Sequence, residues 1–150
     1  MIHYSTVVMI DRRPSDVLAA LLDPELYGRW TEMVDTRFDG PGAPTVGTRG
    51  EFRLPAGPLK GRYEMEIVRL EPDRRLDMRI DGPSLRWLSN ITLEPASGGT
   101  RMTYAGDISL LGWRRILEPL LAGEARAGEG KEAERFKELL EAANPTPAQA

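Results

Sequence analysis

The chain of 150 residues contains no cysteine and a single histidine, His3. Without thiols it can form neither disulfides nor thiolate metal sites, and one histidine leaves the usual His-rich zinc and iron sites without ligands. A Ser-His-Asp arrangement has no support either, because nothing in the sequence places His3 near a serine or a carboxylate. We therefore expect no metal, and we interpret His3 as a surface residue at the edge of a sheet.

The chain also lacks a long apolar run and an excess of positive charge. No apolar segment approaches the ~20 residues that a membrane span needs, and the amino-terminal residues do not have the pattern of a signal peptide. The net charge of −3 and the pI of about 5.3 are not those of a protein that neutralises many phosphates. Glycine-rich nucleotide-binding motifs are missing, so no cofactor is predicted. We expect a cytoplasmic protein with no nucleic-acid partner and no stable membrane insertion.

The amino-terminal part of the chain reads as one strand followed by two short helices. Residues 3–10 are rich in β-branched and aromatic types, which is typical of a strand. Pro14 suits the first turn of a helix with apolar residues at helical spacing, and Asp23-Pro24 ends that helix. Residues 25–29 are predicted to add one more short helical turn.

The middle of the chain changes to a period of two, and its end becomes helical. From Val34 to about Ser109, Gly- and Pro-containing turns separate six segments of strand length, which predicts an antiparallel meander. Residues 112–143 read as a long helix, and residues 144–150 as a disordered tail. Strands followed by a helix, rather than alternating with helices, predict an α+β fold in one domain that covers residues 1–143.

Alternation along the predicted strands assigns one charged face and one apolar face to the sheet. A sheet that is apolar on one side needs a cover, and the carboxy-terminal helix is the only long element available. The apolar face also carries hydroxyls and soft methionines, which suit the orientation of a hydrophobic ligand in a cavity beneath that helix. The residues predicted to line this cavity are Tyr63, Met65, Met78, Trp87, Ser89 and Tyr104.

The long helix carries two apolar stripes that do not share one side. At roughly 100° per residue, the two stripes lie on nearly opposite sides of a straight helix. Glycines between them cost about 1 kcal/mol each relative to alanine, so the helix bends or breaks there, or its halves cover different surfaces. Its middle then offers the sheet no bulky side chain, which predicts a cavity; close helix–sheet approach and fraying are the alternatives. The stripes are Trp113, Ile116, Leu117 and Leu120, then Ala133, Phe136, Leu140 and Ala143, with Gly123, Gly128 and Gly130 between them.

Charged residues on the long helix are candidates for polar contacts with a ligand. The Phe136 side of the helix, extended backwards, reaches Glu129 and Arg126. Either these two form a buried couple that binds a polar head or polarises a carbonyl, or both are solvent-exposed helix charges. Tyrosine hydroxyls, with an ordinary pKa near 10, are poor acid–base groups at neutral pH. We therefore predict Arg126 as a ligand-binding residue and no catalytic residue.

Two further groups of residues stand at the ends of the predicted elements. The turn after Asp23-Pro24 carries Tyr27 and Trp30, and a buried tryptophan contributes enough free energy to anchor an irregular corner. Trp30 is thus predicted to be structural, while Tyr27 either packs there or lies at the cavity mouth. The basic pairs 12–13, 74–75 and 114–115 could touch phosphates or anionic lipid, but in an acidic chain we interpret them as solvated charges.

Several of these motifs together resemble the START-like (SRPBCC) superfamily, and within it the polyketide cyclase/dehydrase and lipid-transport type. The resemblance covers about residues 3–143 and implies a helix-grip fold, in which a curved antiparallel sheet of about seven strands wraps around a long carboxy-terminal helix with a ligand cavity between. The glycines of the long helix depart from the usual pattern. The motifs are Ile10-Asp11, PSDVLAALLDP, Trp30, Val46-Gly47-Thr48, ITLEP, GGTRMTYAGDI and ERFKELLE.

The sequence thus predicts a protein that binds a hydrophobic small molecule, such as a lipid, an isoprenoid or a polyketide-like compound. The members of the superfamily include lipid carriers, aromatase/cyclases and cochaperone domains. Two alternatives therefore remain open: an enzyme of the polyketide cyclase/aromatase type, and a cochaperone-like protein-interaction domain. The resemblance names neither a particular ligand nor an oligomeric state.

Overall fold

The computed structural model describes residues 1–142, so the predicted tail at 144–150 lies outside the described residues. One strand, short helical turns, six strands and a long helix follow one another in the predicted order. The elements are β1 (Ile2–Ile10), α1 (Pro14–Leu21), the 3-10 turn η1 (Pro24–Leu26), α2 (Tyr27–Trp30), β2 (Val34–Phe38), β3 (Arg49–Leu54), β4 (Gly61–Glu71), β5 (Arg75–Asp81), β6 (Leu85–Ala96), β7 (Gly99–Leu110), the 3-10 helix η2 (Gly112–Leu117) and α3 (Glu118–Ala142).

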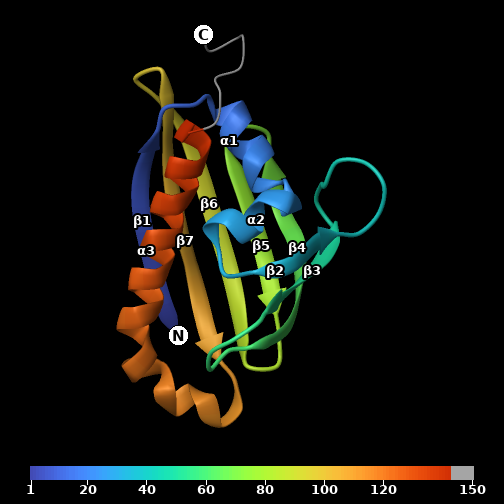
Figure 1. Cartoon of the computed structure of the whole chain (residues 1–150), viewed down its shortest axis with the longest axis vertical. Coiled ribbons are helices and arrows are strands. Elements are labelled where there is room, and N and C mark those ends of the chain that lie inside the picture. The colour runs from blue at the N-terminus through green and yellow to red at the C-terminus, as the bar shows by residue number, and fades with distance from the viewer. Residues whose placement is uncertain (143–150) are drawn as a thin grey trace.

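The seven strands form one antiparallel sheet in the order β1-β7-β6-β5-β4-β3-β2. Every connection from β2 to β7 joins neighbouring strands, which is the predicted meander. The first strand, β1, pairs with β7 and forms one edge of the sheet. Figure 1 shows α3 running along β1 on one face of the sheet, while α1 and α2 lie over the same face at one end. This arrangement is the helix-grip that the sequence predicted.

The face of the sheet that alternation predicted to be apolar is buried. Tyr63, Ile67 and Met102 are fully enclosed, and the short helix α1 adds Val17 and Leu21 to the same core. Because side chains alternate strictly along a strand, one buried position fixes the orientation of its neighbours, and the binary pattern was sufficient to find this face.

Trp30 is an anchor, as predicted, since it is 2 % exposed and its ring contacts Phe136 on α3. Tyr27 does not lie at a cavity mouth. Its side chain is equally buried, and its hydroxyl donates a 2.6 Å hydrogen bond to the carbonyl oxygen of Leu21. The corner after Asp23 is thus closed by both aromatic side chains, whose ring centroids lie 5.2 Å apart.

The helix α3 is continuous through Gly123, Gly128 and Gly130 and follows η2 without a break in the chain. Its two apolar stripes do lie on different sides: Phe136 is buried, whereas Ile116 is exposed. The close helix–sheet approach considered for the glycines is wrong, because a Cβ added at any of the three would meet no atom within 4 Å. No helix within residues 1–142 has the length and hydrophobicity needed to cross a membrane.

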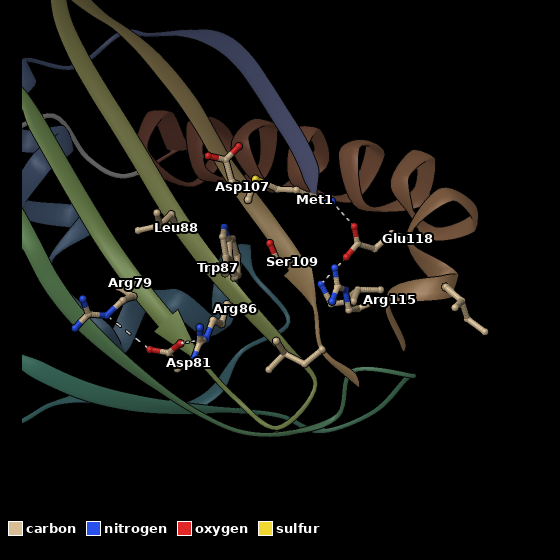
Figure 2. Close-up of a pocket in the computed structure, with 13 residues that line it drawn as sticks. Met1, Arg79, Asp81, Arg86, Trp87, Leu88, Asp107, Ser109, Arg115 and Glu118 are labelled. Carbon is tan, nitrogen blue, oxygen red and sulfur yellow. Dashed lines mark hydrogen bonds and ion pairs between the residues drawn. The ribbon is translucent and has the colours of Figure 1, made fainter. Parts of the chain in front are cut away.

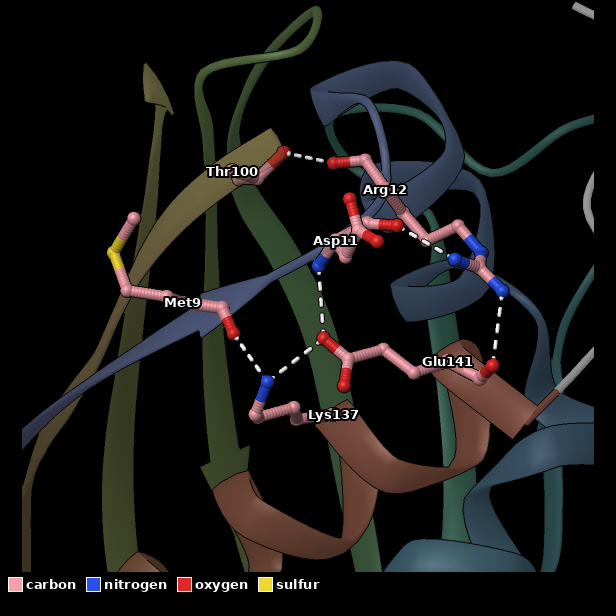
Figure 3. Close-up of polar contacts among 6 residues, drawn as sticks. All are labelled: Met9, Asp11, Arg12, Thr100, Lys137 and Glu141. Atoms are coloured by element: carbon pink, nitrogen blue, oxygen red, sulfur yellow. Dashed lines mark hydrogen bonds and ion pairs between the residues drawn. The ribbon is translucent and has the colours of Figure 1, made fainter. Parts of the chain in front are cut away.

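Side chains near the end of α3 fasten it to the strand β1 and the turn after it (Figure 3). Lys137 donates a 2.7 Å hydrogen bond to the carbonyl oxygen of Met9, and the main-chain N–H of Asp11 donates to Glu141 at 2.8 Å. The guanidinium of Arg12 donates to the carbonyl oxygen of Glu141 at 3.0 Å. Because β1 is an edge strand, these bonds also cover main-chain groups that another chain could otherwise pair with.

Candidate functional site

A row of small residues crosses the inner face of the sheet and makes room for one tyrosine ring. In this row Tyr4 of β1 is paired with Gly106 of β7, which is paired with Ser89 of β6. A Cβ on Gly106 would lie 2.5 Å from the hydroxyl of Tyr4 and 2.6 Å from the carbonyl oxygen of Leu88. The absence of a side chain at Gly106 therefore allows the Tyr4 hydroxyl to reach the middle of the sheet.

Aromatic side chains and two glutamates of α3 meet around this hydroxyl. The indole N–H of Trp87 donates to the Tyr4 hydroxyl at 2.9 Å, and the Tyr104 hydroxyl donates to Oε2 of Glu132 at 3.1 Å. The rings of Tyr4 and Tyr104 lie 5.8 Å apart, centroid to centroid. We call Tyr4, Trp87, Ser89, Tyr104, Glu129 and Glu132 the inner polar cluster.

Glu129 is the unusual member of the inner polar cluster. The residue is 9 % exposed, and its Oε2 atom is buried without a hydrogen-bond partner among the described residues. Burial, followed by the charge of Glu132, raises the pKa of Glu129 from 4.5 to about 9. Burial also raises the pKa of Glu132, although bonds from Glu129 and Tyr104 and the charge of Arg135 oppose the rise. Two interacting carboxyl groups titrate as a pair, and the raised pKa keeps Glu129 protonated at neutral pH.

The tyrosines of the inner polar cluster remain protonated over the whole physiological range. Burial, with the negative charge of Glu129, raises the pKa of both Tyr4 and Tyr104 above its ordinary value. Their hydroxyls can therefore donate and accept hydrogen bonds but cannot act as bases near neutral pH. The carboxyl groups of Glu129 and Glu132, both with raised pKa values, are the acid–base groups that the cluster offers.

A second orphaned polar atom lies beside the inner polar cluster. The indole nitrogen of Trp30 is buried without a hydrogen-bond partner within residues 1–142, and its ring lies 6.2 Å from that of Tyr104 and 4.9 Å from that of Phe136. Unpaired buried donors and acceptors are rare in folded proteins, and each asks for an explanation such as a bound molecule. The unpaired polar atoms of Trp30 and Glu129 both belong to helices that contact Tyr104.

The structure brings three of the seven predicted site residues together, namely Trp87, Ser89 and Tyr104. Tyr63 lies apart, where its hydroxyl donates to the carbonyl oxygen of Leu59 at 2.5 Å and lies 2.7 Å from the hydroxyl of Ser84. Met65 and Met78 are 3 % and 4 % exposed on the same face of the sheet.

Arg126 does not form the buried couple with Glu129 that the helix spacing suggested. Its side chain is exposed, and its Nε atom donates a 2.8 Å hydrogen bond to the carbonyl oxygen of His3 on β1. The ring of His3 is exposed too and contacts the carboxylate of Asp107 on the neighbouring strand, a contact that the sequence did not predict. Burial of a guanidinium without a full set of partners is costly, which favours the position of Arg126 at the edge.

Sequence reasoning missed Tyr4 and Glu132 as site residues. Tyr4 belongs to a strand whose partner could not be known, and only the β1–β7 register places it opposite Gly106. Glu132 lies three residues after Glu129, a spacing that puts both carboxyls on one side of a helix. That spacing, together with the apolar residues Ala133 and Phe136 on the same helix, could have indicated that Glu132 belongs to the site.

The largest described hollows lie outside the core. One, of about 980 Å³, opens on the outer face of the sheet where β5, β6 and β7 meet η2 (Figure 2). Its walls combine apolar side chains such as Leu88, Leu111 and Ile116 with charged ones, and Asp81 is paired with Arg86 at 3.4 Å and with Arg79 at 3.7 Å. Trp87 borders this hollow, as Met65 borders a smaller charged one of about 330 Å³ on β3 to β5. The smaller hollow, lined mostly by charged side chains, does not suit an apolar ligand.

Solved structures of several proteins share this fold. Protein MLL2253 from Mesorhizobium loti is 21% identical, with a TM-score of 0.70, and the match covers 95% of this chain and 99% of that one. TTHA0849 from Thermus thermophilus is 17% identical, with a TM-score of 0.73 and coverage of 94% and 99%. DynU16, from the dynemicin biosynthetic locus, is 19% identical with a TM-score of 0.70; the match covers 97% of this chain and 49% of DynU16.

These identities establish the fold alone. No curated protein matches the chain significantly. The family model described as polyketide cyclase / dehydrase and lipid transport, however, matches residues 1–141, nearly all of the part that the structure describes. The match agrees with the seven-stranded antiparallel sheet and the long carboxy-terminal helix. The chain therefore belongs to the polyketide cyclase/dehydrase and lipid-transport family.

Proposed function

We propose that the chain binds a hydrophobic small molecule, such as a lipid, an isoprenoid or a polyketide-like compound, between the sheet and α3. One observation carries the proposal: the buried Oε2 atom of Glu129 has no hydrogen-bond partner among the described residues. An unpaired buried polar group costs roughly 1–3 kcal/mol, and a strongly shifted pKa at such a place is typical of functional sites. A ligand whose polar end bonds to Glu129 would remove that cost.

The protonation of Glu129 selects the polar end of the ligand. Because its pKa is raised far above neutral pH, Glu129 can donate its proton to a neutral acceptor such as a ketone, an ester or a hydroxyl oxygen. A ligand carboxylate would instead meet the negative charge that Glu129 and Glu132 share, and would bind more weakly. The aromatic rings of Trp30 and Tyr104 supply the apolar surroundings of this end.

The first half of α3 is the part of the core that can yield space to a ligand. On its inner side, Leu121, Ala122 and Ala125 are only partly buried, whereas Ala133 and Phe136 farther along are completely buried. Two of the three inner residues before Glu129 are alanines, so few van der Waals contacts hold this half against the sheet. A modest outward shift of the segment would open a space next to Glu129.

Calorimetric titration with a matched pair of ligands tests the proposal. We expect 2-dodecanone, a neutral ketone, to bind more tightly than dodecanoate, which has the same chain length and a negative charge. Glu129→Ala should weaken binding of the ketone by about tenfold, the loss of one hydrogen bond in the interior, and should abolish the preference. Glu124→Ala, at an exposed position of the same helix, is the matched control. Equal ketone affinity in the wild type and Glu129→Ala would contradict the proposal.

An enzyme of the polyketide cyclase/aromatase type is the second candidate function. The observation that favours it is the pair of carboxyl groups of Glu129 and Glu132, with raised pKa values, beside the Tyr104 hydroxyl. Such a pair can take a proton from the carbon next to a ketone while Tyr104 bonds to the carbonyl oxygen, which is the first step of an intramolecular condensation. NMR of 2-dodecanone in deuterated water separates the candidates, since only an enzyme would exchange the α-protons and lose that activity in Glu132→Gln.

A further inference from the structure

The corner between β7 and α3 exposes large apolar side chains to solvent. Trp113 is 66% exposed, Ile116 75% and Leu120 76%, and with Met1 at 67% they are the four most exposed large apolar residues of the described part of the chain. All three belong to residues 112–120, which we call the elbow. Figure 1 shows the elbow projecting at one end of the molecule, opposite the end where α1 lies over the sheet.

The exposed side chains of the elbow do not serve the core. Leu117 and Leu121, which alternate with them along the helix, pack against the core and hold this segment in place. Trp113, Ile116 and Leu120 are mostly exposed instead, and Ile116 borders the hollow of about 980 Å³ on the outer face of the sheet. Single exposed apolar residues are common on proteins, but three within two helical turns are not explained by the fold.

The elbow is also positively charged, although the whole chain carries a net charge of −3. Arg114 and Arg115 lie between the exposed apolar residues, and the guanidinium of Arg114 lies 4.9 Å from the centre of the Trp113 ring. The acidic residue of the elbow, Glu118, is turned back to accept the main-chain N–H of Leu110 at 3.0 Å.

We propose that the elbow docks on an anionic lipid surface. Tryptophan prefers the boundary between headgroups and acyl chains, where its ring is in an apolar layer and its N–H in a wet one. Ile116 and Leu120 would enter the same layer beside it, and the two arginines would contact lipid phosphates. The combination of a Trp/Ile/Leu side with arginines at its border is the composition of helices that lie in the plane of a membrane.

A second copy of the chain fits the elbow less well than a lipid surface does. The three apolar side chains expose roughly 400 Å², whereas a stable dimer buries ~800 Å² on each partner. A twofold contact centred on the elbow would also bring four arginines together, two from each copy, and like charges in an interface oppose association. An anionic bilayer instead complements the charge of the elbow.

Co-sedimentation with lipid vesicles tests the proposal on the full chain. We expect more binding to phosphatidylcholine vesicles containing about one-third phosphatidylglycerol than to pure phosphatidylcholine vesicles. The triple variant Trp113→Ala, Ile116→Ala, Leu120→Ala should bind both at least tenfold more weakly, because it loses the apolar insertion. The double variant Arg114→Gln, Arg115→Gln should lose about fivefold per arginine on the anionic vesicles only.

Matched variants at the other end of the sheet serve as controls. Arg74→Gln with Arg101→Gln removes the same charge from exposed positions near the β4–β5 and β6–β7 turns, and should leave vesicle binding within twofold of wild type. Equal binding of the wild type to both kinds of vesicle, or an equal loss in this control, would overturn the proposal. So would light scattering that shows a dimer which the triple variant dissolves, because the elbow would then be a contact between copies.

Discussion

The substitution Glu129→Gln tests the inner polar cluster most directly, because it removes the titratable proton and keeps the shape of the side chain. The carboxyl is 9 % exposed, so solvent screens it little. Its pKa is about 9 in the folded chain and 4.5 in an unfolded one. Below pH 4.5 both states are protonated, and the carboxyl contributes no pH dependence to the free energy of unfolding.

Between pH 4.5 and 9 the unfolded chain loses this proton while the folded chain keeps it. Stability therefore falls as the pH rises through this window, because the folded state binds more protons than the unfolded state. Each pH unit corresponds to at most ~1.4 kcal/mol, so the loss between pH 4.5 and 7 is about 3 kcal/mol. Glutamine is neutral in both states, and the variant should be more stable than wild type at pH 7 by a similar amount.

Urea unfolding followed by far-UV circular dichroism, at one-unit steps from pH 5 to pH 8, measures this difference. The gap between Glu129→Gln and wild type should be small at pH 5 and widen with pH. Glu118 and Glu141, whose pKa values are lowered, titrate below this range and do not disturb it. The free energy of unfolding of the control variant Glu124→Gln should change with pH in the same way as that of wild type. Parallel curves for Glu129→Gln would refute the raised pKa and, with it, the protonated donor on which the proposed ligand preference depends.

Three further outcomes follow from packing. Trp30→Ala should lower the free energy of unfolding by about 3–5 kcal/mol, and a loss below ~1 kcal/mol in urea melts would show that the ring is not enclosed. Gly106→Ala should lower the free energy of unfolding by ~1–3 kcal/mol because its methyl group meets Tyr4. Gly128→Ala, in open space on the helix, should raise it by about 0.4–1 kcal/mol. Urea melts in which Gly106→Ala is the more stable of the two variants would contradict both expectations. Amides of residues 121–125 should exchange hydrogen faster than those of 133–137, and uniform protection along α3 would contradict its unequal packing.

The sheet could be predicted from the sequence because its signal is local. The period of two between Val34 and Ser109 and the turns rich in Gly and Pro determine both strand positions and faces. Met78 and Tyr104 were therefore assigned to the buried face without knowledge of the pairing. The site was less accessible, because Tyr4 reaches it only through the pairing of the first strand with the last, a contact between residues about 100 positions apart.

Helical phase explains which predictions about α3 succeeded. Glu129 precedes Phe136 by seven residues, so at roughly 100° per residue its side chain points within ~20° of the buried Phe136. Arg126 precedes Phe136 by ten residues and points ~80° away, at the flank of the helix. The same count puts Leu120 on the far side. A difference of ~60° in direction between positions 126 and 129 is therefore enough to separate a buried acid from an exposed base.

The two halves of α3 thus perform different tasks. The second half is fixed, since Ala133 and Phe136 are fully buried and Lys137 is bonded to β1. The first half contains no fully buried side chain before Glu129, and it continues from the elbow, whose apolar residues face solvent. A lipid surface that binds the elbow would therefore act on the first half of α3, which has the fewest packing contacts with the core. Since that part covers the space next to Glu129, docking and ligand exchange would be coupled through one movable element.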